Sequence, residues 1–260
     1  MSRLLHAVPR RWRGAVLPLA GLLLWTLAWA GAWSDSPLLV SPLSIAAEGL
    51  AQWRSGALAE ALQASLLRDA VGGLIGAGTG LLLGLLLGGS PLAERLLGPS
   101  LHTFKQISLF AWVPLISVWF GLGEASKVVF IALAAAMPVL LNTLEGVRSV
   151  PAELREVGRV LRLGRWQRLR HLVLPSAAPS ILAGLHLALI YAWLATLGAE
   201  YLLSNGAGIG HLISDGREQF RMDWVLLGVL VVGLVGHVLN QSAQWLERRA
   251  LRWRAPHAAH

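Results

Sequence analysis

Residues 151–175, with the sequence PAELREVGRVLRLGRWQRLRHLVLP, form the longest strongly charged run in this chain. Its six arginines, at positions 155, 159, 162, 165, 168 and 170, are opposed by only two carboxylates, Glu153 and Glu156. Long apolar segments lie on both sides, so the run is predicted to be a hydrophilic loop between two membrane-spanning helices. We expect this loop to be the contact of the chain with a partner protein.

The composition of the 260 residues indicates a membrane protein. Hydrophobic residues make up 55% of the chain and charged residues 14%, whereas a soluble domain carries about 25% charged residues. The net charge is +8, but the arginines gather at segment ends and in one loop, which argues against nucleic-acid binding and is typical of a cytoplasmic membrane face. The chain has no cysteine, which excludes disulfides and thiolate metal sites.

Six segments are apolar enough to cross a membrane, for which roughly 20 residues are needed. We predict an all-α polytopic protein, one domain over residues 1–260, with spans at about 16–33, 70–89, 101–121, 128–144, 180–203 and 224–245. Residues 34–65 are too polar to span, and we expect short interfacial helices around 45–53 and 58–66. The basic N-terminus before the first apolar run could belong to a signal peptide, but an uncleaved first span is the better interpretation.

The arginines predict the orientation of these spans. Four precede the first span and four follow the last: Arg3, Arg10, Arg11, Arg13, Arg248, Arg249, Arg252 and Arg254. With six spans, both termini and residues 145–175 fall on the same side of the membrane. The positive-inside rule makes that side cytoplasmic and places residues 34–65 and 204–223 outside.

Glycines recur every fourth residue in the second predicted span. They are Gly72, Gly76, Gly80, Gly84 and Gly88. This spacing places them on one side of a helix, where a neighbouring backbone can approach closely. The stripe is interpreted either as packing against another helix of the same chain or as a face that slides during transport.

A few polar or interfacial residues in the apolar segments are candidates for a solute pathway. They are Lys105, Gln106, Trp112, Asn142 and Glu200. Ionisable groups within spans are costly and commonly functional. Most of these residues lie near predicted span ends, however, where snorkelling to the interface is the alternative interpretation.

No motif of the chain indicates an enzyme. There is no phosphate-binding loop, no H-E-x-x-H and no G-x-S-x-G. His102, His186 and His237 lack the paired spacing of haem or metal ligands and are interpreted as packing residues. We therefore expect no catalytic residue, no metal and no cofactor in this chain. An ion-gradient-driven transporter is a distant alternative, but mid-span acids and internal repeats are not evident.

The central loop has amphipathic periodicity. Leu154, Val157, Val160 and Leu161 recur at helical spacing, while arginines line another side of the same helix. We predict a helix near residues 152–163, a turn at Gly164 and a second helix that enters the fifth span at Pro175. Such a helix suits a groove in a partner protein, and a solvated loop is the alternative.

The loop resembles the EAA motif of ABC-importer permeases. Glu156, Val157 and Gly158 match its start, Arg162 stands where the motif has glycine, and residues 172–175 (LVLP) match its end. The arginine allows two explanations, a turn shifted to Gly164 or a matching acid on the partner. The coupling residues implied by the resemblance are Glu153, Arg155, Glu156, Gly158, Arg159, Arg162 and Gly164.

Residues 112–115 (WVPL), 119–127 (WFGLGEASK) and 206–210 (GAGIG) also resemble permeases that import nitrate, aliphatic sulfonates and taurine. The resemblance implies a type I ABC-importer permease fold in the bacterial inner membrane. It further implies a homodimer, a cytoplasmic ATPase dimer that binds ATP and Mg, and a periplasmic substrate-binding protein. The implied cargo is a small anion, either an aliphatic sulfonate or taurine, with nitrate, a bicarbonate-like anion or a thiamine-pyrimidine precursor as alternatives. Residues 204–210 are then expected to be a flexible outer element.

Overall fold

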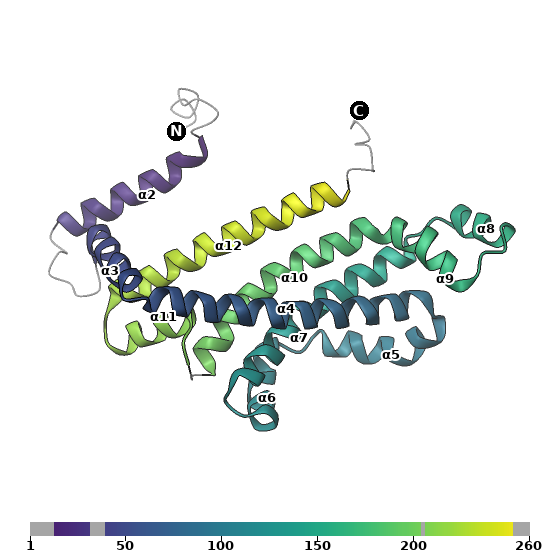
Figure 1. The fold of residues 1–260 in the computed structure, drawn as a ribbon, viewed down its shortest axis with the longest axis horizontal. Coiled ribbons are helices and arrows are strands. Elements are labelled where there is room, and N and C mark those ends of the chain that lie inside the picture. The colour runs from purple at the N-terminus through teal and green to yellow at the C-terminus, as the bar shows by residue number, and fades with distance from the viewer. Residues whose placement is uncertain (1–12, 32–39, 204–205, 252–260) are drawn as a thin grey trace. The chain divides into compact units, whose positions relative to one another are not determined.

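The computed structural model describes residues 13–31, 40–203 and 206–251, and every secondary-structure element in these ranges is helical (Figure 1). The elements are α2 (Arg13–Ala30), α3 (Pro42–Arg54), α4 (Ala57–Gly89), α5 (Pro91–Phe104), the 3₁₀ turn η1 (Leu109–Trp112), α6 (Val113–Phe120), α7 (Glu124–Arg148), α8 (Ala152–Val160), α9 (Arg165–Arg168), the π-helical turn η2 (Leu169–Val173), α10 (Leu174–Leu202), α11 (Ile209–Glu218) and α12 (Met222–Ala250). The all-α prediction is confirmed. Arg3, Arg10, Arg11, Arg252, Arg254, residues 32–33 of the first predicted span and residues 204–205 of the glycine-rich segment lie outside the described residues.

Four of the described helices are long and apolar enough to cross a membrane. They are Ala57–Gly89, Glu124–Arg148, Arg165–Leu202 and Met222–Ala250. Three of them contain a whole predicted span, and Arg165–Leu202 covers all but the last residue of the span predicted at 180–203. Two shorter apolar helices, Ala20–Ala30 and Leu109–Phe120, lie in the first and third predicted spans.

The third predicted span, residues 101–121, is not one continuous helix. Helix α5 ends at Phe104, and a tight turn comes next in which the amide of Gln106 donates to the Thr103 carbonyl at 3.0 Å. The polar run around Lys105 favours this break. Pro114 then lies in the first turn of α6, a position at which its missing N–H costs nothing.

The expected separate helix at residues 58–66 is also absent from the described chain, because α4 runs unbroken from Ala57 for 33 residues. Gly56, with a φ of +83°, separates α3 from α4, and α4 itself contains no proline that would interrupt it. Ser65 of this stretch finds a buried partner in Glu200, while Glu60 stays exposed.

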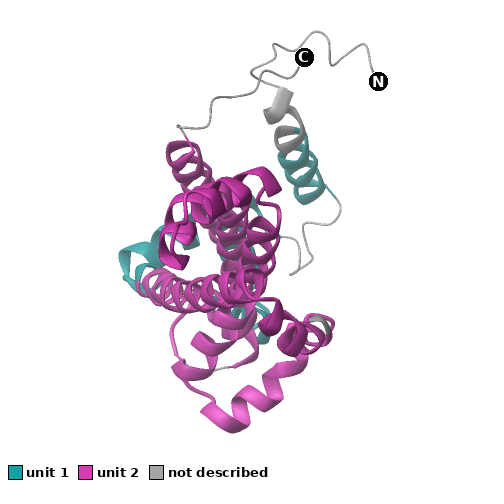
Figure 2. Ribbon diagram, turned by 90° about the vertical axis from the view of Figure 1, so that its right-hand side faces the viewer, with its two compact units in different colours: residues 1–59, 212–230 teal, residues 60–211, 231–260 magenta. Residues whose placement is uncertain are grey.

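The chain divides into two compact units (Figure 2). Unit 1 comprises Met1–Ala59 and Leu212–Leu230, and unit 2 comprises Glu60–His211 and Val231–His260. In unit 1, Glu48 of α3 accepts a hydrogen bond from Trp224 Nε1 at 2.8 Å and pairs with Arg221 at 3.0 Å. These contacts join α3 to the start of α12.

Unit 2 is built on close contact between α4, α7 and α10. A Cβ added at Gly72 would lie 2.7 Å from Ile131, one at Gly84 would lie 2.6 Å from Thr143, and one at Gly88 would lie 2.7 Å from Val147. Gly76 and Gly80 likewise abut the backbone of α7 at Ala132 and Ala136. The stripe therefore packs against one helix of the same chain, and its sliding stays a prediction.

The contact between α7 and α10 uses small residues in the same way. A Cβ at Gly146 would meet Ser180 at 2.8 Å, and one at Gly184 would meet Asn142 at 2.8 Å. Phe130, Ile131 and Val139 of α7 pack with the buried alanines 188, 192, 195 and 199 of α10. In a lipid environment, such close backbone packing is a main source of helix association.

Helix α12 contacts α10 through polar groups of unit 2. Trp193 Nε1 donates to the Val232 carbonyl at 3.2 Å, and His186 Nε2 lies 2.7 Å from Asn240 Oδ1. His186 Nδ1 lies 3.3 Å from Glu247. His186 therefore joins α10 to α12, in agreement with its interpretation as a packing residue.

Candidate functional site

The predicted coupling segment, residues 145–175, contains α8, a nine-residue helix that comes after Pro151. Arg155 ties it to the preceding helix, because its Nη2 donates to the carbonyls of Arg148 at 2.9 Å and Val147 at 3.3 Å. Carbonyls at the end of a helix have no partner within it, and a guanidinium is well suited to satisfy them. Arg155 therefore fixes where α8 leaves α7.

Arg162 forms the turn that ends α8. Its φ is +49°, the amide of Leu163 donates to the Gly158 carbonyl at 3.0 Å, and the Arg162 amide donates to the Arg159 carbonyl at 3.0 Å. These two bonds and the left-handed residue define a Schellman motif, in which that position is most often glycine. The chain thus keeps the backbone shape that glycine favours while carrying arginine.

The predicted turn at Gly164 is wrong. Helix α8 ends at Val160, and Gly164, with φ −63° and ψ 165°, instead caps the start of α9. Its amide donates to Gln167 Oε1 at 2.9 Å. The turn falls at Arg162 because the hydrogen bonds of the Schellman motif close there, so a shifted turn does not explain the arginine.

Gly158 lets α8 approach the next helical segment. A Cβ at this position would lie 2.6 Å from Leu172 Cδ1. The predicted second helix leads into the fifth span at Pro175, because Arg165–Leu202 is one continuous helical run, of which η2 is one turn. Pro175 follows η2 within this run, where the hydrogen-bond pattern changes from π-helical to α-helical.

The outer face of α8 has no partner among the described residues. Leu154, Val157, Val160 and Leu161 are exposed by 38 to 81%. Glu153 is also exposed, and Glu156 only approaches Arg159, at 4.0 Å between two exposed side chains. An apolar stripe beside an available carboxylate is a surface suited to docking.

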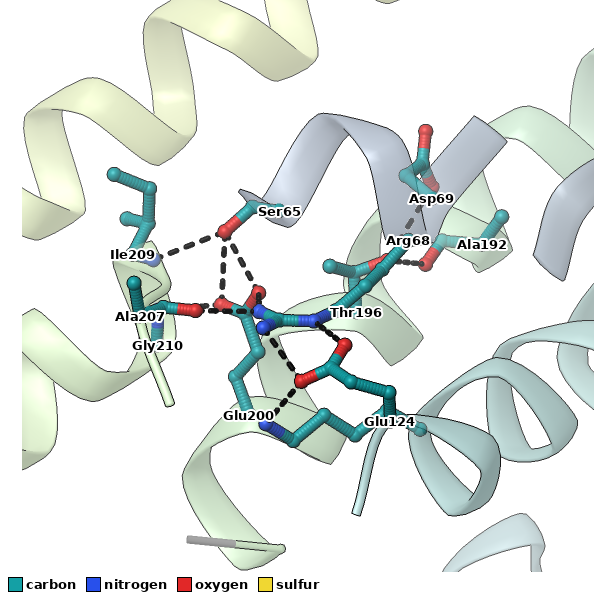
Figure 3. A network of polar contacts seen from close by, with 11 residues as sticks. Ser65, Arg68, Asp69, Glu124, Ala192, Thr196, Glu200, Ala207, Ile209 and Gly210 are labelled. Atoms are coloured by element: carbon teal, nitrogen blue, oxygen red, sulfur yellow. Dashed lines mark hydrogen bonds and ion pairs between the residues drawn. The ribbon is translucent and has the colours of Figure 1, made fainter. Parts of the chain in front are cut away.

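A buried polar network lies at the other end of α7 and α10 (Figure 3). Arg68 of α4 donates from Nη1 to Glu200 Oε1 at 2.7 Å, and both residues are buried. Ser65 Oγ lies 2.7 and 2.9 Å from the same carboxylate oxygens, and the amide of Gly210 donates to the carboxylate at 2.8 Å. A buried carboxylate is tolerated because its oxygens are satisfied in this way.

Arg68 also holds Glu124 at the start of α7. Its Nε and Nη2 lie 2.5 and 2.8 Å from the two carboxylate oxygens, a bidentate arrangement. The buried Lys127 Nζ lies 3.4 Å from Glu124. Two cations and two carboxylates therefore balance each other where α4, α7 and α10 meet.

The glycine-rich segment closes on this network. Arg68 Nη1 donates to the Ala207 carbonyl at 2.6 Å, and the amide of Ile209 donates to Ser65 Oγ at 2.9 Å. A Cβ at Gly208 would lie 2.5 Å from Glu200 Cδ. The contacts of residues 206–210 are those of a fastened loop rather than of the flexible element that we expected.

Three members of the network, Ser65, Arg68 and Glu124, were not predicted from the sequence. The second predicted span begins at residue 70, which places the adjacent charges of Arg68 and Asp69 outside the membrane helix. Asp69 is in fact buried within α4, where Thr196 Oγ1 donates to it at 3.4 Å. The sequence did contain a signal for this network. Arg68 and Asp69 lie just before one apolar run, and Glu200 lies near the end of another.

The contacts of the described residues do not join the five pathway candidates into one site. Lys105 and Gln106 are exposed in the turn after α5, and the Trp112 ring packs 4.7 Å from the Phe104 ring. Asn142 Nδ2 donates to the Pro138 carbonyl of its own helix at 2.8 Å. Glu200 belongs to the buried network, and a pathway role for these residues stays a prediction.

Comparison with known proteins identifies the family. Residues 79–252 match the model of the binding-protein-dependent transport system inner membrane component. A Bacillus subtilis protein named as an aliphatic sulfonates transport permease, SsuC, is 37% identical over 93% of this chain and 87% of its own. The bicarbonate transport system permease CmpB of Synechococcus elongatus is 34% identical over 94% and 93% of the two chains. The taurine transport system permease TauC of Escherichia coli is 33% identical over 67% and 63%.

The family match begins within α4 and covers α7, the segment from α8 to η2, α10 and α12. The chain is therefore a member of the family of inner-membrane permease components of binding-protein-dependent ABC transport systems.

Proposed function

We propose that this permease carries an aliphatic sulfonate or taurine from the periplasm to the cytoplasm. The observation that supports this cargo best is the 37% identity to the aliphatic sulfonates permease, which extends over 93% of the chain. The similarity to a taurine permease supports the same chemical class. Both cargoes carry a sulfonate group on a small organic chain, and taurine carries an ammonium group as well.

Bicarbonate is the second candidate, because a bicarbonate permease is 34% identical over 94% of the chain. A nitrate import permease is also 34% identical, over 73% of the chain. All of these cargoes carry an anionic group, which a basic chain of net charge +8 favours electrostatically.

The work of transport is divided between subunits. This chain is the permease, and the ATPase is a separate subunit that binds ATP and Mg. Transport in this family depends on a binding protein. We infer that two copies of this chain form the membrane part, with two ATPase subunits on the cytoplasmic side.

Helix α8 is then the part of the permease that the ATPase moves. Its exposed apolar stripe fits a groove, with Glu156 beside it, and Arg155 and Gly158 hold the helix against α7 and η2. A shift of α8 would be passed to α10 through η2, since Arg165–Leu202 is continuous. Rigid-body movement of packed helices can expose a pathway to one side at a time.

The orientation that fits this role has both termini and α8 in the cytoplasm. Arg148 at the end of α7 and Arg248 and Arg249 at the end of α12 support it through the positive-inside rule. The buried network of Arg68, Glu124 and Glu200 would then lie at the periplasmic end of unit 2.

Uptake by the assembled importer tests the cargo. The permease would be reconstituted in liposomes with its ATPase and its binding protein, and ATP-dependent entry of labelled taurine, an alkanesulfonate, bicarbonate and nitrate would be measured. We expect uptake of taurine or the alkanesulfonate alone. Uptake of bicarbonate or nitrate without either sulfonate would contradict the proposal, while leaving the permease role intact.

A further inference from the structure

A cavity of about 1010 Å³ lies in unit 2, at the end that carries α8. It is bordered by the last turns of α4, the end of α7 and the segment from α8 to η2. Its apolar surface includes Leu82, Leu85 and Leu86 of α4 together with Leu169 and Leu172 of η2.

Four arginines border the same cavity: Arg155, Arg159, Arg165 and Arg168. Within the described part of the chain, no aspartate or glutamate lines it. The contact of Arg159 with Glu156 is long, at 4.0 Å, and exposed, so it neutralises little charge. No ion pair of the described residues involves Arg165 or Arg168.

The cavity is lined both by arginines and by leucines. A small inorganic anion would use the arginines alone. Guanidinium groups bind phosphate oxygens in a bidentate manner. Leucines at the end of a membrane-capable helix instead favour hydrocarbon. The volume is also at the upper end of the range for pockets that enclose a whole organic ligand, about 300–1,000 Å³. Basic pockets between membrane helices are known to hold lipid headgroups.

We propose that this cavity binds an anionic phospholipid, with the phosphate of the headgroup on Arg165 and Arg168 and the upper acyl chains on the leucines of α4 and η2. The lipid would lie directly beside α8 and would contribute to its position. The proposal rests on the cavity and its charges, and it depends neither on the cargo nor on how the ATPase docks.

Lipid retention by the full-length chain tests the site. The protein would be purified into nanodiscs of phosphatidylcholine with a minor fraction of phosphatidylglycerol, and bound phosphatidylglycerol would be counted by native mass spectrometry after release. The test variant is Arg165→Gln/Arg168→Gln. The matched control is Arg170→Gln/Arg248→Gln, which removes the same charge from exposed arginines that do not line the cavity.

We expect the test variant to lose phosphatidylglycerol affinity by about tenfold or more, because each charge-assisted hydrogen bond contributes on that order. The control variant should keep its phosphatidylglycerol affinity. An equal loss in both variants would show general charge attraction and would overturn the site. The site would also be overturned if the wild type retained phosphatidylcholine as well as it retains phosphatidylglycerol.

Two further arms keep the test decisive. Inorganic phosphate at millimolar concentration should not displace the lipid, and full displacement would show a free-anion site instead. If the double variant fails to fold, Arg168→Lys and Arg168→Gln replace it: lysine should keep most of the affinity and glutamine should lose it. Equal affinity of these two variants would contradict the proposal.

Discussion

Arg162 occupies a left-handed conformation that costs an ordinary residue about 1–2 kcal/mol. The hydrogen bonds of the Schellman motif hold it there, and they fix the exit of α8 toward α9. Strain kept at a position next to a docking surface is consistent with a functional demand on the arginine side chain. The matching acid on the ATPase is the remaining explanation of the two that the sequence allowed.

Replacement of this residue by glycine tests the strain. Arg162→Gly should raise stability by up to roughly 1 kcal/mol, because relief of the left-handed penalty outweighs the added freedom of the unfolded chain. Thermal unfolding in detergent would measure it. Arg159→Gly, inside α8, is the control and should lower stability by about 1 kcal/mol. A similar loss in both variants would disprove the strain.

Arg68 is the residue on which the buried network depends. Arg68→Gln should destabilise the protein by about 3–5 kcal/mol, because it leaves the Glu200 carboxylate buried without its charged partner. The exposed Arg95→Gln is the matched control and should stay within about 0.5 kcal/mol of the wild type. Both would be followed by thermal unfolding, and similar melting temperatures for the two variants would refute a structural role of the network.

At the scale of elements, the contact between α4 and α7 decides the shape of unit 2. Glycine brings two helix backbones together on one side of α4, while a Cβ added at Gly78 of the same helix would contact no neighbouring segment within 4 Å. The helix therefore has one face that tolerates no side chain and another that does.

This difference predicts opposite effects of the same mutation. Gly84→Ala should cost about 1–3 kcal/mol, because its Cβ would lie 2.6 Å from Thr143. Gly78→Ala should instead be neutral or stabilise α4 by about 0.5–1 kcal/mol. Thermal unfolding of both variants is the measurement, and destabilisation by Gly78→Ala would contradict the assignment of faces.

Reversing the charge of Glu156 tests whether α8 couples the permease to the ATPase. Glu156→Lys should abolish uptake and the stimulation of ATP hydrolysis by the binding protein, because the reversed charge meets the ATPase groove. The amount of protein in the membrane should not change. Glu60→Lys, the same change at an exposed residue of α4, should transport normally. Normal uptake by Glu156→Lys would refute docking through this residue.

At the scale of the whole molecule, the absence of cysteine makes orientation directly measurable. Glu60→Cys and Glu153→Cys place single thiols at exposed residues on α4 and α8. A membrane-impermeant maleimide added to spheroplasts should label residue 60 and should label residue 153 only after lysis. The reverse pattern would invert the proposed topology.

The sequence predicted those parts of the molecule that local composition determines. Apolar runs located the four long helices, and the four-residue spacing of Gly72 to Gly88 located a packing face. It could not locate the end of α5 or the unbroken start of α4, because both depend on whether polar residues such as Lys105 and Arg68 find partners. Those partners lie in distant segments: Arg68 meets Glu124 and Glu200 only after folding.

The π-helical turn Leu169–Val173 has a consequence for how this chain can change in length. A π-helical turn takes up one more residue than an α-helical turn without altering the phase of the helix on either side. Deletion of a single residue here would leave Arg165 and Arg168 facing the cavity. The same deletion within α10 would rotate everything before it by about 100°, since an α-helix has 3.6 residues per turn. A single-residue deletion should therefore disturb the coupling segment less at η2 than within α10.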